Sequence, residues 1–560
     1  MLKDYKLARS ILRQLENEPI LPEIGYESRI IWFAVAKFYR ELLYLSNTLE
    51  SMLQYGRLAI VSFLKASMQQ AALTIFEYLI KRIVPSGKYL EKLGELLSLF
   101  DASAFDQAKV IYFRELFLVN PNATEVFDLL LSRGFSDFED RLLSRNLIRV
   151  LLKRGNNALC FDFINKIRVI DPRLYFSLLG IALSYLPNEE TNKKFLDLVN
   201  NDLSNFLITL WEYINEVEYI PGFFPELIVK ALGKVETKDQ ADILAKILAV
   251  ALEKCDIESI GIMNLIISKL YNLGARNGLI ELALKYAINL LSKNASSSQA
   301  YLDLAINICY EVEDQPCTLR VFKAYAAAAL RLGLKTLLVN AIRTFNKENK
   351  ISGLQHLEIW NELFQVATSN EKFRELTEIF SSTSELINEV RHKIGLESLI
   401  TIIVSDSEND IFKAIERLIS LSDPLYLIIA VEYLSKKKFT DGIRYILNNL
   451  EHAKLRANEL GEILFAVALG SVQNHQEYLL LETVKTAEKL LLPRSAPVYA
   501  SFLNEISNKI IDEREKLAIK LLKKAAKLFE ESGMYWMSLN AHAIISARRA
   551  YSKWRFKSVG

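Results

Sequence analysis

Glycine and proline, the residues that most often interrupt regular structure, are scarce in this chain of 560 residues. There are 20 glycines and 12 prolines, and no proline lies between Pro225 and Pro316 or between Pro316 and Pro424. Stretches this long without proline are expected to form helices or extended strands. In residues 239–256 the apolar side chains recur at helical spacing, and strand-like alternation is missing over any comparable length. The sequence therefore predicts an all-α protein.

Long apolar runs are also missing. A membrane-spanning helix needs about 18 or more apolar residues, whereas the richest segments, 424–434 and 463–472, are shorter and end in polar residues. The first 18 residues are charged and amphipathic from the start, with neither an apolar core nor a small-residue cleavage site. We therefore expect no secretory signal and no membrane insertion.

Cysteine is rare, and its spacing indicates no special chemistry. The four cysteines, Cys160, Cys255, Cys309 and Cys317, form no CxxC pair. A disulfide framework is not expected, and a cytoplasmic location follows by default. Cys160 and Cys309 lie among apolar residues, so we interpret both as unreactive thiols of the core.

Motifs that hold phosphates, metals or cofactors are missing as well. The sequence contains neither GxxxxGK[ST] nor GxGxxG, and no two of its five histidines lie within one helical turn of each other. Pairs of carboxylates are common, but they fall at the starts and ends of predicted helices. Two of the groups, Glu189–Glu190 and Asp406/Glu408/Asp410, are expected at helix starts, where the positive end of the helix dipole stabilises them. We therefore predict no catalytic, metal-binding or cofactor-binding residues, no small-molecule substrate and no enzyme activity. The alternative is a metal site whose ligands come from distant parts of the chain.

Helix starts are well marked. The capping-box pattern occurs at Ser136–Glu139, Thr237–Gln240, Ser352–Gln355 and Ser382–Glu385. We expect roughly 28 to 30 helices of about 15 to 20 residues, joined by short turns that make consecutive helices antiparallel. So many helices cannot surround one core, and the usual solution is a stack of helix pairs.

Two segments carry a repeat pattern. In one, Ala518, Leu522 and Ala525 precede Trp536, Leu539, Asn540 and Ala543; in the other, Ala283, Ala287 and Leu290 precede Tyr301, Leu304, Ala305 and Ile308. The residues 279–308 and 514–547 resemble the tetratricopeptide repeat, whose second helix carries small residues and whose next repeat opens with W-x2-L-G-x2-Y. Asn540 and Ala305 replace the glycine of that family, and Glu530 replaces its proline. The resemblance implies an α-solenoid of stacked antiparallel helix pairs that acts as an assembly or regulatory scaffold, with HEAT-like or irregular pairs as alternatives elsewhere.

One interruption suggests a boundary between parts of the stack. The segment 216–228 holds two prolines and a glycine, which exclude a continuous helix. The sequence thus predicts an N-terminal helical-repeat half (1–220), a C-terminal helical-repeat half (221–513) and a basic terminal helix pair (514–560). The alternative is a longer loop between two helices, with Phe223 and Phe224 buried.

Positive charge is concentrated at the C-terminus. The whole chain has a formal net charge of +2, yet from Arg514 onward there are 11 Lys and Arg against 3 Asp and Glu, whereas the remainder has 58 against 64. Five of the lysines fall on one face of a predicted helix, within about 100° of one another. The candidate binding residues, for a partner protein or a nucleic acid, are Lys516, Lys520, Lys523, Lys524, Lys527, Arg548, Arg549, Lys553, Arg555 and Lys557.

The last helix combines this charge with an apolar stripe. Its members are Leu539, Ala543, Ala547, Ala550 and Trp554, and we expect His542 to be partly buried against the preceding helix. The stripe is expected to pack against the preceding repeat, and the helix end against a second copy or another protein.

Taken as a class of function, these patterns favour a non-enzymatic, protein-binding scaffold or regulatory factor that uses a helical-repeat surface. The alternative is a nucleic-acid- or ribosome-associated factor that docks on RNA or a ribonucleoprotein through the C-terminal basic face. The sequence encodes no partner identity and no oligomeric state.

Overall fold

The computed structural model describes residues 2–17, 28–119, 125–135, 138–254, 263–349, 352–387 and 389–557, and of residues 102, 103, 139, 315, 348, 349 and 554–557 only the backbone. These residues form 30 α-helices and three short 3-10 helices, with no strand among them. The predicted all-α class is confirmed. The number of helices falls in the predicted range of roughly 28 to 30.

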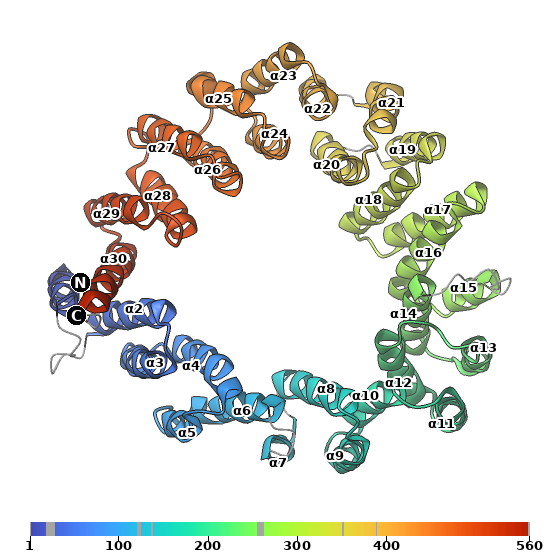
Figure 1. Ribbon diagram of the computed structural model, residues 1–560. Coiled ribbons are helices and arrows are strands. Elements are labelled where there is room, and N and C mark those ends of the chain that lie inside the picture. Colours follow the sequence, from blue (N-terminus) through green and yellow to red (C-terminus); the bar gives the residue numbers. More distant parts are fainter. Residues whose placement is uncertain are drawn as a thin grey trace. The chain divides into compact units, whose positions relative to one another are not determined.

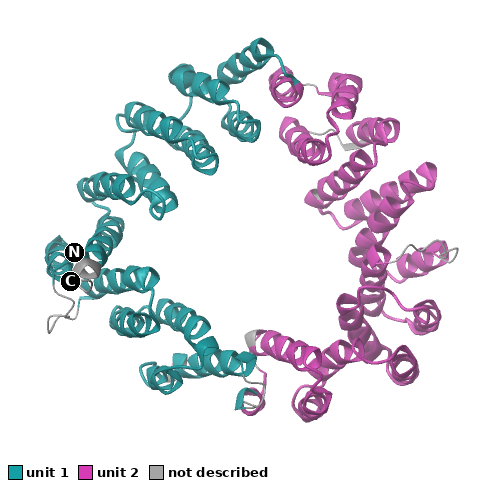
Figure 2. Ribbon diagram, in the orientation of Figure 1, with its two compact units in different colours: residues 1–126, 405–560 teal, residues 127–404 magenta. Residues whose placement is uncertain are grey.

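The chain folds into two compact units (Figure 2). Unit 1 comprises Met1–Val126 and Ser405–Gly560, and unit 2 comprises Phe127–Val404. The chain therefore leaves unit 1 after its first helices and returns to it for the last ones. The three parts predicted from the sequence have their boundaries elsewhere, and that division stays a prediction.

The helices of unit 1 come from both ends of the chain. The first group is α1 (Leu2–Leu15), α2 (Arg29–Leu45), α3 (Leu49–Lys65), α4 (Gln69–Ile83), α5 (Leu90–Leu97) and α6 (Ala102–Val119), with α7 (Glu125–Arg133) at the boundary. The second group is α23 (Glu408–Leu421), α24 (Pro424–Lys436), α25 (Thr440–Asn449), α26 (Ala457–Gln473), α27 (Glu477–Leu491), α28 (Ala496–Ile510), α29 (Glu515–Glu531) and α30 (Tyr535–Lys557). The 3-10 helices Val84–Ser86 and Leu450–His452 follow α4 and α25.

Unit 2 is continuous in sequence. Its helices are α8 (Phe138–Lys153), α9 (Asn157–Ile170), α10 (Pro172–Leu183), α11 (Asn188–Asn201), α12 (Leu203–Glu216), α13 (Phe224–Lys234), α14 (Lys238–Lys254) and α15 (Met263–Asn272). They continue with α16 (Arg276–Leu290), α17 (Ala295–Glu311), α18 (Gln315–Arg331), α19 (Lys335–Asn349), α20 (Gly353–Asn370), α21 (Phe373–Thr383), a 3-10 turn (Ser384–Leu386) and α22 (Val390–Val404). The segment 216–228 comprises the end of α12, the loop 217–223 and the start of α13; Phe224 of α13 is buried and Phe223 of the loop is half-buried.

Unit 2 is a stack of helix pairs in two layers. Each even-numbered helix from α8 to α22 packs against the next even-numbered one, and these helices form one layer. The odd-numbered helices form the second layer (Figure 1). Glycines let two of these helix pairs come close. A β-carbon on Gly180 of α10 would overlap the carbonyl oxygen of Thr209 in α12, and one on Gly278 of α16 would overlap that of Asp242 in α14. At these two positions the absence of a side chain lets the backbones of the neighbouring helices approach each other closely.

Unit 1 joins the two ends of the chain. Packing runs from α28 through α29 to α30, and α30 then packs directly on α1 and α2, which lead on to α3, α4 and α6. We call α1, α2 and α30 the terminal junction (Figure 1). The last helix therefore has a partner within the chain, the N-terminal helices α1 and α2. The side chains of residues 554–557 lie outside the described residues, so the expectation that the helix end packs against a second copy or another protein stays a prediction.

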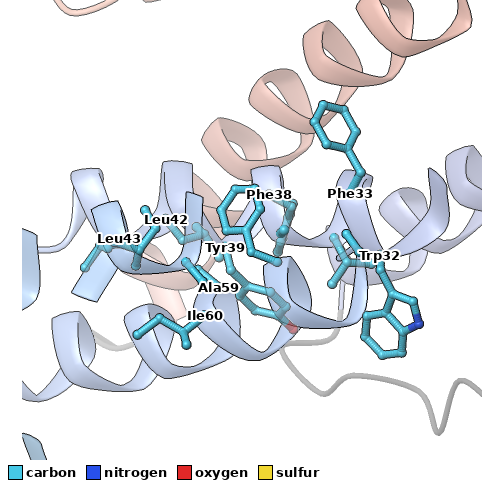
Figure 3. Close-up of a cluster of buried hydrophobic side chains, with 14 of the residues drawn as sticks. Trp32, Phe33, Phe38, Tyr39, Leu42, Leu43, Ala59 and Ile60 are labelled. Carbon is cyan, nitrogen blue, oxygen red and sulfur yellow. The ribbon is translucent and has the colours of Figure 1, made fainter. Parts of the chain in front are cut away.

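The terminal junction has a shared apolar core. Leu539, Ala543, Ala547 and Ala550 of α30 are each fully buried and belong to the cluster that holds the core residues of α1 to α6. Figure 3 shows the α2 and α3 side of this cluster, where Phe33 points toward α30 and meets the Trp536 ring at 5.0 Å between centroids. The predicted stripe is therefore buried at these four positions. The side chain of Trp554 lies outside the described residues.

Polar contacts fix the direction of α1. The hydroxyls of Tyr5 and Ser538 lie 2.9 Å apart, and at the other end Lys553 donates to Asn17 over 3.0 Å. These two contacts place α1 parallel to α30.

The capping boxes were predicted with mixed success. Gln240 and Thr237 exchange backbone-to-side-chain hydrogen bonds of 3.3 and 3.4 Å, and Ser352 does the same with Gln355. Ser382 is a wrong prediction, because it lies in the last turn of α21 and donates to the carbonyl oxygen of Glu378. Ser136 lies outside the described residues.

The cysteine prediction also needs correction. Cys309 and Cys317 form a disulfide that joins the end of α17 to the start of α18, with their Cα atoms 5.7 Å apart. Cys309 is therefore no free thiol, and the default argument for a cytoplasmic location loses its basis, so that location stays a prediction. Cys160 is free and buried, and its burial raises the pKa of the thiol to about 12.

Among the described helices, none is both long enough and apolar enough to cross a membrane.

Candidate binding surfaces

Three of the predicted lysines stand free on α29. Lys516, Lys520 and Lys523 are exposed, and among the described residues no acidic side chain lies within ion-pair distance of them. Their opposite face is buried, with Ala518, Leu522 and Ala525 at the predicted small or packing positions. This part of the helix therefore has the predicted amphipathic form.

The other two lysines of α29 have acidic neighbours. Lys524 lies 2.5 Å from a carboxylate oxygen of Glu488 on α27, and its ammonium lies 5.3 Å from the centre of the Tyr499 ring. Lys527 lies 3.6 Å from Glu531 of its own helix. The expected row of five lysines without an interleaved acid is thus shorter, because α27 contributes a carboxylate to Lys524 and the last residue of α29 contributes one to Lys527.

The cations of α30 contact other helices of unit 1. Arg548 pairs with Asp512 at 2.8 Å, Arg549 approaches Glu16 at 3.5 Å, and Lys553 donates to Asn17. The side chains of Arg555 and Lys557 lie outside the described residues. One flank of α30 is therefore occupied by α1.

A cavity that the sequence did not reveal lies between α1, α29 and α30. This terminal cavity, of about 360 Å³, is lined by Arg9, Leu12 and Arg13 of α1 with Glu16 just after it, by Lys523, Lys527 and Glu530 of α29, and by His542, Ile545, Ser546 and Arg549 of α30. The predicted basic residues Lys523, Lys527 and Arg549 are brought together here, along with two arginines from the opposite end of the chain.

A second hollow lies in unit 2. This unit 2 groove, of about 370 Å³, crosses α8, α10, α12 and α14 and is lined by Arg141, Arg145, Arg173, Leu174, Ser177, Ile208, Trp211, Glu212, Ile243 and Lys246. Four of these residues are cations and one is a carboxylate. Each helix contributes only two or three residues, so no local sequence pattern identifies the set.

The single carboxylate of the unit 2 groove is already neutralised. Glu212 is 6% exposed, lies 2.6 Å from Arg145 and accepts a hydrogen bond of 3.0 Å from Ser177. Arg173 and Lys246, by contrast, have no acidic partner among the described residues. Half-buried Ile208, Trp211 and Ile243 form an apolar floor between these cations. The groove therefore combines uncompensated positive charge with apolar surface.

Two histidines, buried His356 and half-buried His542, have a lowered pKa. Burial, with a smaller contribution from His392, lowers the pKa of His356 to about 4. Burial, followed by the charges of Arg9, Arg13 and Arg549, lowers the pKa of His542 to about 4. His542 of α30 is half-buried and lines a cavity with residues of the preceding helix, α29, as predicted. Residues of α1 are additional neighbours. Over the described ranges, no group of three or more His, Cys, Asp or Glu is placed to hold a metal ion.

Comparisons with known proteins give only distant matches. No protein-family model matches the chain, and no curated protein sequence does. Among solved structures, "Structure of Naa15/Naa10 bound to HypK-THB" is similar over 94% of this chain and 100% of that chain, at 10% identity and a TM-score of 0.23. "Crystal structure of APC/C hetero-tetramer Cut9-Hcn1" matches 90% of this chain and 98% of that one, at 11% identity and a TM-score of 0.18. "Circular tandem repeat protein with novel repeat topology and enhanced subunit contact surfaces" matches 93% and 99%, at 15% identity and a TM-score of 0.12.

The helix packing itself defines the class. In both segments with the repeat pattern, the small residues are fully buried: Ala283, Ala287 and Ala305 in one, and Ala518, Ala525 and Ala543 in the other. The helices that carry them pack on each other, α16 on α17 and α29 on α30. Within each unit, the described helices therefore form the stacked pairs of an α-solenoid.

Proposed function

We propose that this chain is a non-enzymatic scaffold that binds protein partners, and that an extended acidic segment of a partner occupies the unit 2 groove. The observation that supports the proposal is the combination of unpaired cations and apolar floor across four successive helices. Carboxylates of a partner would meet Arg173 and Lys246, while an apolar or aromatic side chain would cover Trp211.

The dimensions of the unit 2 groove fit such a segment. Four adjacent helices at usual spacing cover roughly 24 to 30 Å, which corresponds to about eight residues of extended chain. The ion pair of half-buried Arg145 with buried Glu212 gives the groove a fixed charged wall, because each partner holds the other in place. A segment that adds carboxylates would therefore find positions that are already ordered.

The proposal assigns no acid–base chemistry to the groove. Its carboxylate, Glu212, is engaged by an arginine and a serine hydroxyl at the same oxygen. We therefore assign Glu212 the role of orienting Arg145.

The test is a binding titration with a defined probe. A fluorescein-labelled 12-residue peptide of alternating Glu and Leu with one Phe is titrated with the full chain, and fluorescence anisotropy is measured. The double variant Arg173→Glu/Lys246→Glu is expected to weaken binding by about tenfold or more, since both charges that face the peptide are reversed.

The matched control is Lys193→Glu/Lys194→Glu, which makes the same charge change on α11, outside the groove. It is expected to change the affinity by about twofold or less. Equal losses in the two variants would attribute binding to the overall charge of unit 2 and contradict the proposal. A peptide with Lys in place of Glu that binds as tightly would also contradict the proposal.

The alternative function is docking on RNA or a ribonucleoprotein. The observation that favours it is the free positive charge of Lys516, Lys520 and Lys523 on α29. It is tested by titrating a labelled single-stranded RNA with the chain at low and high salt. Salt-sensitive binding that Lys516→Glu/Lys520→Glu abolishes and Lys193→Glu/Lys194→Glu leaves intact would support it.

A further inference from the structure

The terminal cavity is built by three helices from opposite ends of the chain. α1 contributes one wall, α29 the second and α30 the third, and Leu12 and Ile545 provide the apolar part of the lining. The walls are linked by Arg9 and Glu530 at 2.9 Å, and by Ser546, which donates to Glu16 over 2.7 Å. The cavity is therefore a built feature of the terminal junction, since ion pairs and hydrogen bonds hold its sides together.

Its charge is unbalanced. Five cations and two carboxylates line the terminal cavity. The two carboxylates already have partners: Glu530 pairs with Arg9, and Glu16 accepts from Ser546 and lies near Arg549. Arg13 and Lys523 have no acidic partner among the described residues. Both side chains line the cavity and are exposed to solvent, so their positive charge is available to an anion that enters from solution.

His542 supplies a neutral polar group in the same place. Its Nε2 atom is buried and has no hydrogen-bond partner. The charged groups around it are Arg9 and Arg13 of α1, Glu16 just after α1, Lys523, Lys527 and Glu530 of α29, and Arg549 of its own helix. This nitrogen is therefore available to a ligand or a water molecule that enters the cavity.

We propose that the terminal cavity binds a compact molecule that carries several phosphate groups, with Arg13 and Lys523 as its principal charged contacts and His542 as a hydrogen-bond partner. Guanidinium and ammonium groups from separate helices match the clustered oxygens of such a ligand. The ligand would connect α1 to α29 and α30 and so close the terminal junction more firmly.

The volume favours a small molecule. About 360 Å³ lies within the usual size of small-molecule sites, roughly 300 to 1,000 Å³. The strand of a nucleic acid would instead follow an open face, such as the one formed by Lys516 and Lys520 on α29. Lys516 and Lys520 lie outside the cavity lining, so their replacement distinguishes a nucleic acid from a ligand of the cavity.

The test uses inorganic tripolyphosphate as the probe and the full chain as the protein. Calorimetric titration is expected to show one molecule bound per chain, at least about tenfold more tightly than inorganic phosphate, because the probe reaches several cations at once. Binding is expected to weaken as salt is raised. The thermal midpoint of unfolding should rise with tripolyphosphate, since the ligand binds only the folded junction.

Two variants on a shared design locate the site. Arg13→Gln/Lys523→Gln should weaken tripolyphosphate binding by about tenfold or more. The matched control Lys516→Gln/Lys520→Gln removes two charges from α29 outside the cavity and should leave the affinity within about twofold of the original. Melting curves without ligand verify that both variants are folded. Equal weakening by both pairs, or no saturable binding by the unchanged chain, would overturn the proposal.

The nuclear magnetic resonance signal of His542 gives a second readout. A bound anion stabilises the imidazolium, so tripolyphosphate should raise the pKa of His542 from its low value. The rise should vanish in Arg13→Gln/Lys523→Gln. An unchanged His542 titration in a saturated complex would place the ligand elsewhere and overturn the proposal.

Two further probes identify the source of the phosphates. The chain is first mixed with vesicles that contain phosphatidic acid, and tripolyphosphate is then added. Vesicle binding that tripolyphosphate reverses would indicate a lipid headgroup. Failure to bind the vesicles would indicate a soluble phosphorylated molecule. Either result keeps the site. A single-stranded RNA that displaces tripolyphosphate, and that both lysine pairs weaken equally, would assign the charge to nucleic acid and overturn the proposal.

Discussion

Replacing Ala543 with glutamate is expected to separate the two ends of unit 1. Ala543 is fully buried in the core that α30 shares with the first helices. A carboxylate there would be unpaired and cut off from water, which costs roughly 3 to 5 kcal/mol or more. The core of α1 and α2 would then lose the partner that covers it.

Hydrogen exchange measured by mass spectrometry tests this expectation. In Ala543→Glu, amide protection should fall in residues 2–17 and 29–45, which are far from residue 543 in sequence, and stay unchanged across unit 2. Met537→Glu is the control, because Met537 belongs to the same helix but is 37% exposed. Full protection of residues 2–17 in Ala543→Glu would mean that α1 does not depend on α30.

Adding one methyl group at Gly180 is the second large expected effect. The new β-carbon of Gly180→Ala would overlap the carbonyl oxygen of Thr209, a backbone atom that no side-chain rotation can move away. α10 and α12 would have to separate, which loses contacts along both helices. We expect the unfolding free energy to fall by about 2 to 3 kcal/mol.

Chemical denaturation followed by circular dichroism measures this change. Gly233→Ala is the matched control, because Gly233 also lies in a helix of unit 2 and its added carbon would meet nothing within 4 Å. There alanine should stabilise the chain by roughly 0.5 kcal/mol through its better helix propensity. If the Gly180→Ala variant is as stable as the original, α10 and α12 can accommodate the added methyl group without separating, and the prediction is contradicted.

Local patterns in the sequence predicted what is local in the structure. Sparse proline and glycine indicated long helices, and the pairs Thr237–Gln240 and Ser352–Gln355 marked two real helix starts because the capping bonds join residues three apart. The small residues at Ala518 and Ala525 predicted a close helix crossing for the same reason. Ser382 failed because its pattern also fits a serine that bonds back to the preceding turn.

Contacts between distant residues were out of reach. Tyr5 and Ser538 are separated by 533 positions, so no periodicity connects them. Arg9 and Arg13 were unremarkable cations on an amphipathic helix until the fold brought them to Lys523. The Cys309–Cys317 pair was missed because its spacing is informative only once two helices are known to turn back on each other there. The unit 2 groove draws its residues from four helices and has no pattern of its own.

The terminal junction also sets an order of events during synthesis. A ribosome that adds about 5 to 20 residues each second needs roughly 25 to 110 s to pass from the first helix to the last one. Unit 2 is complete long before that, while the apolar side of α2 waits for α30. The segment translated first is thus among the last to be covered. A nascent chain is therefore most prone to misassociation at its N-terminal helices, and chaperone protection matters most there.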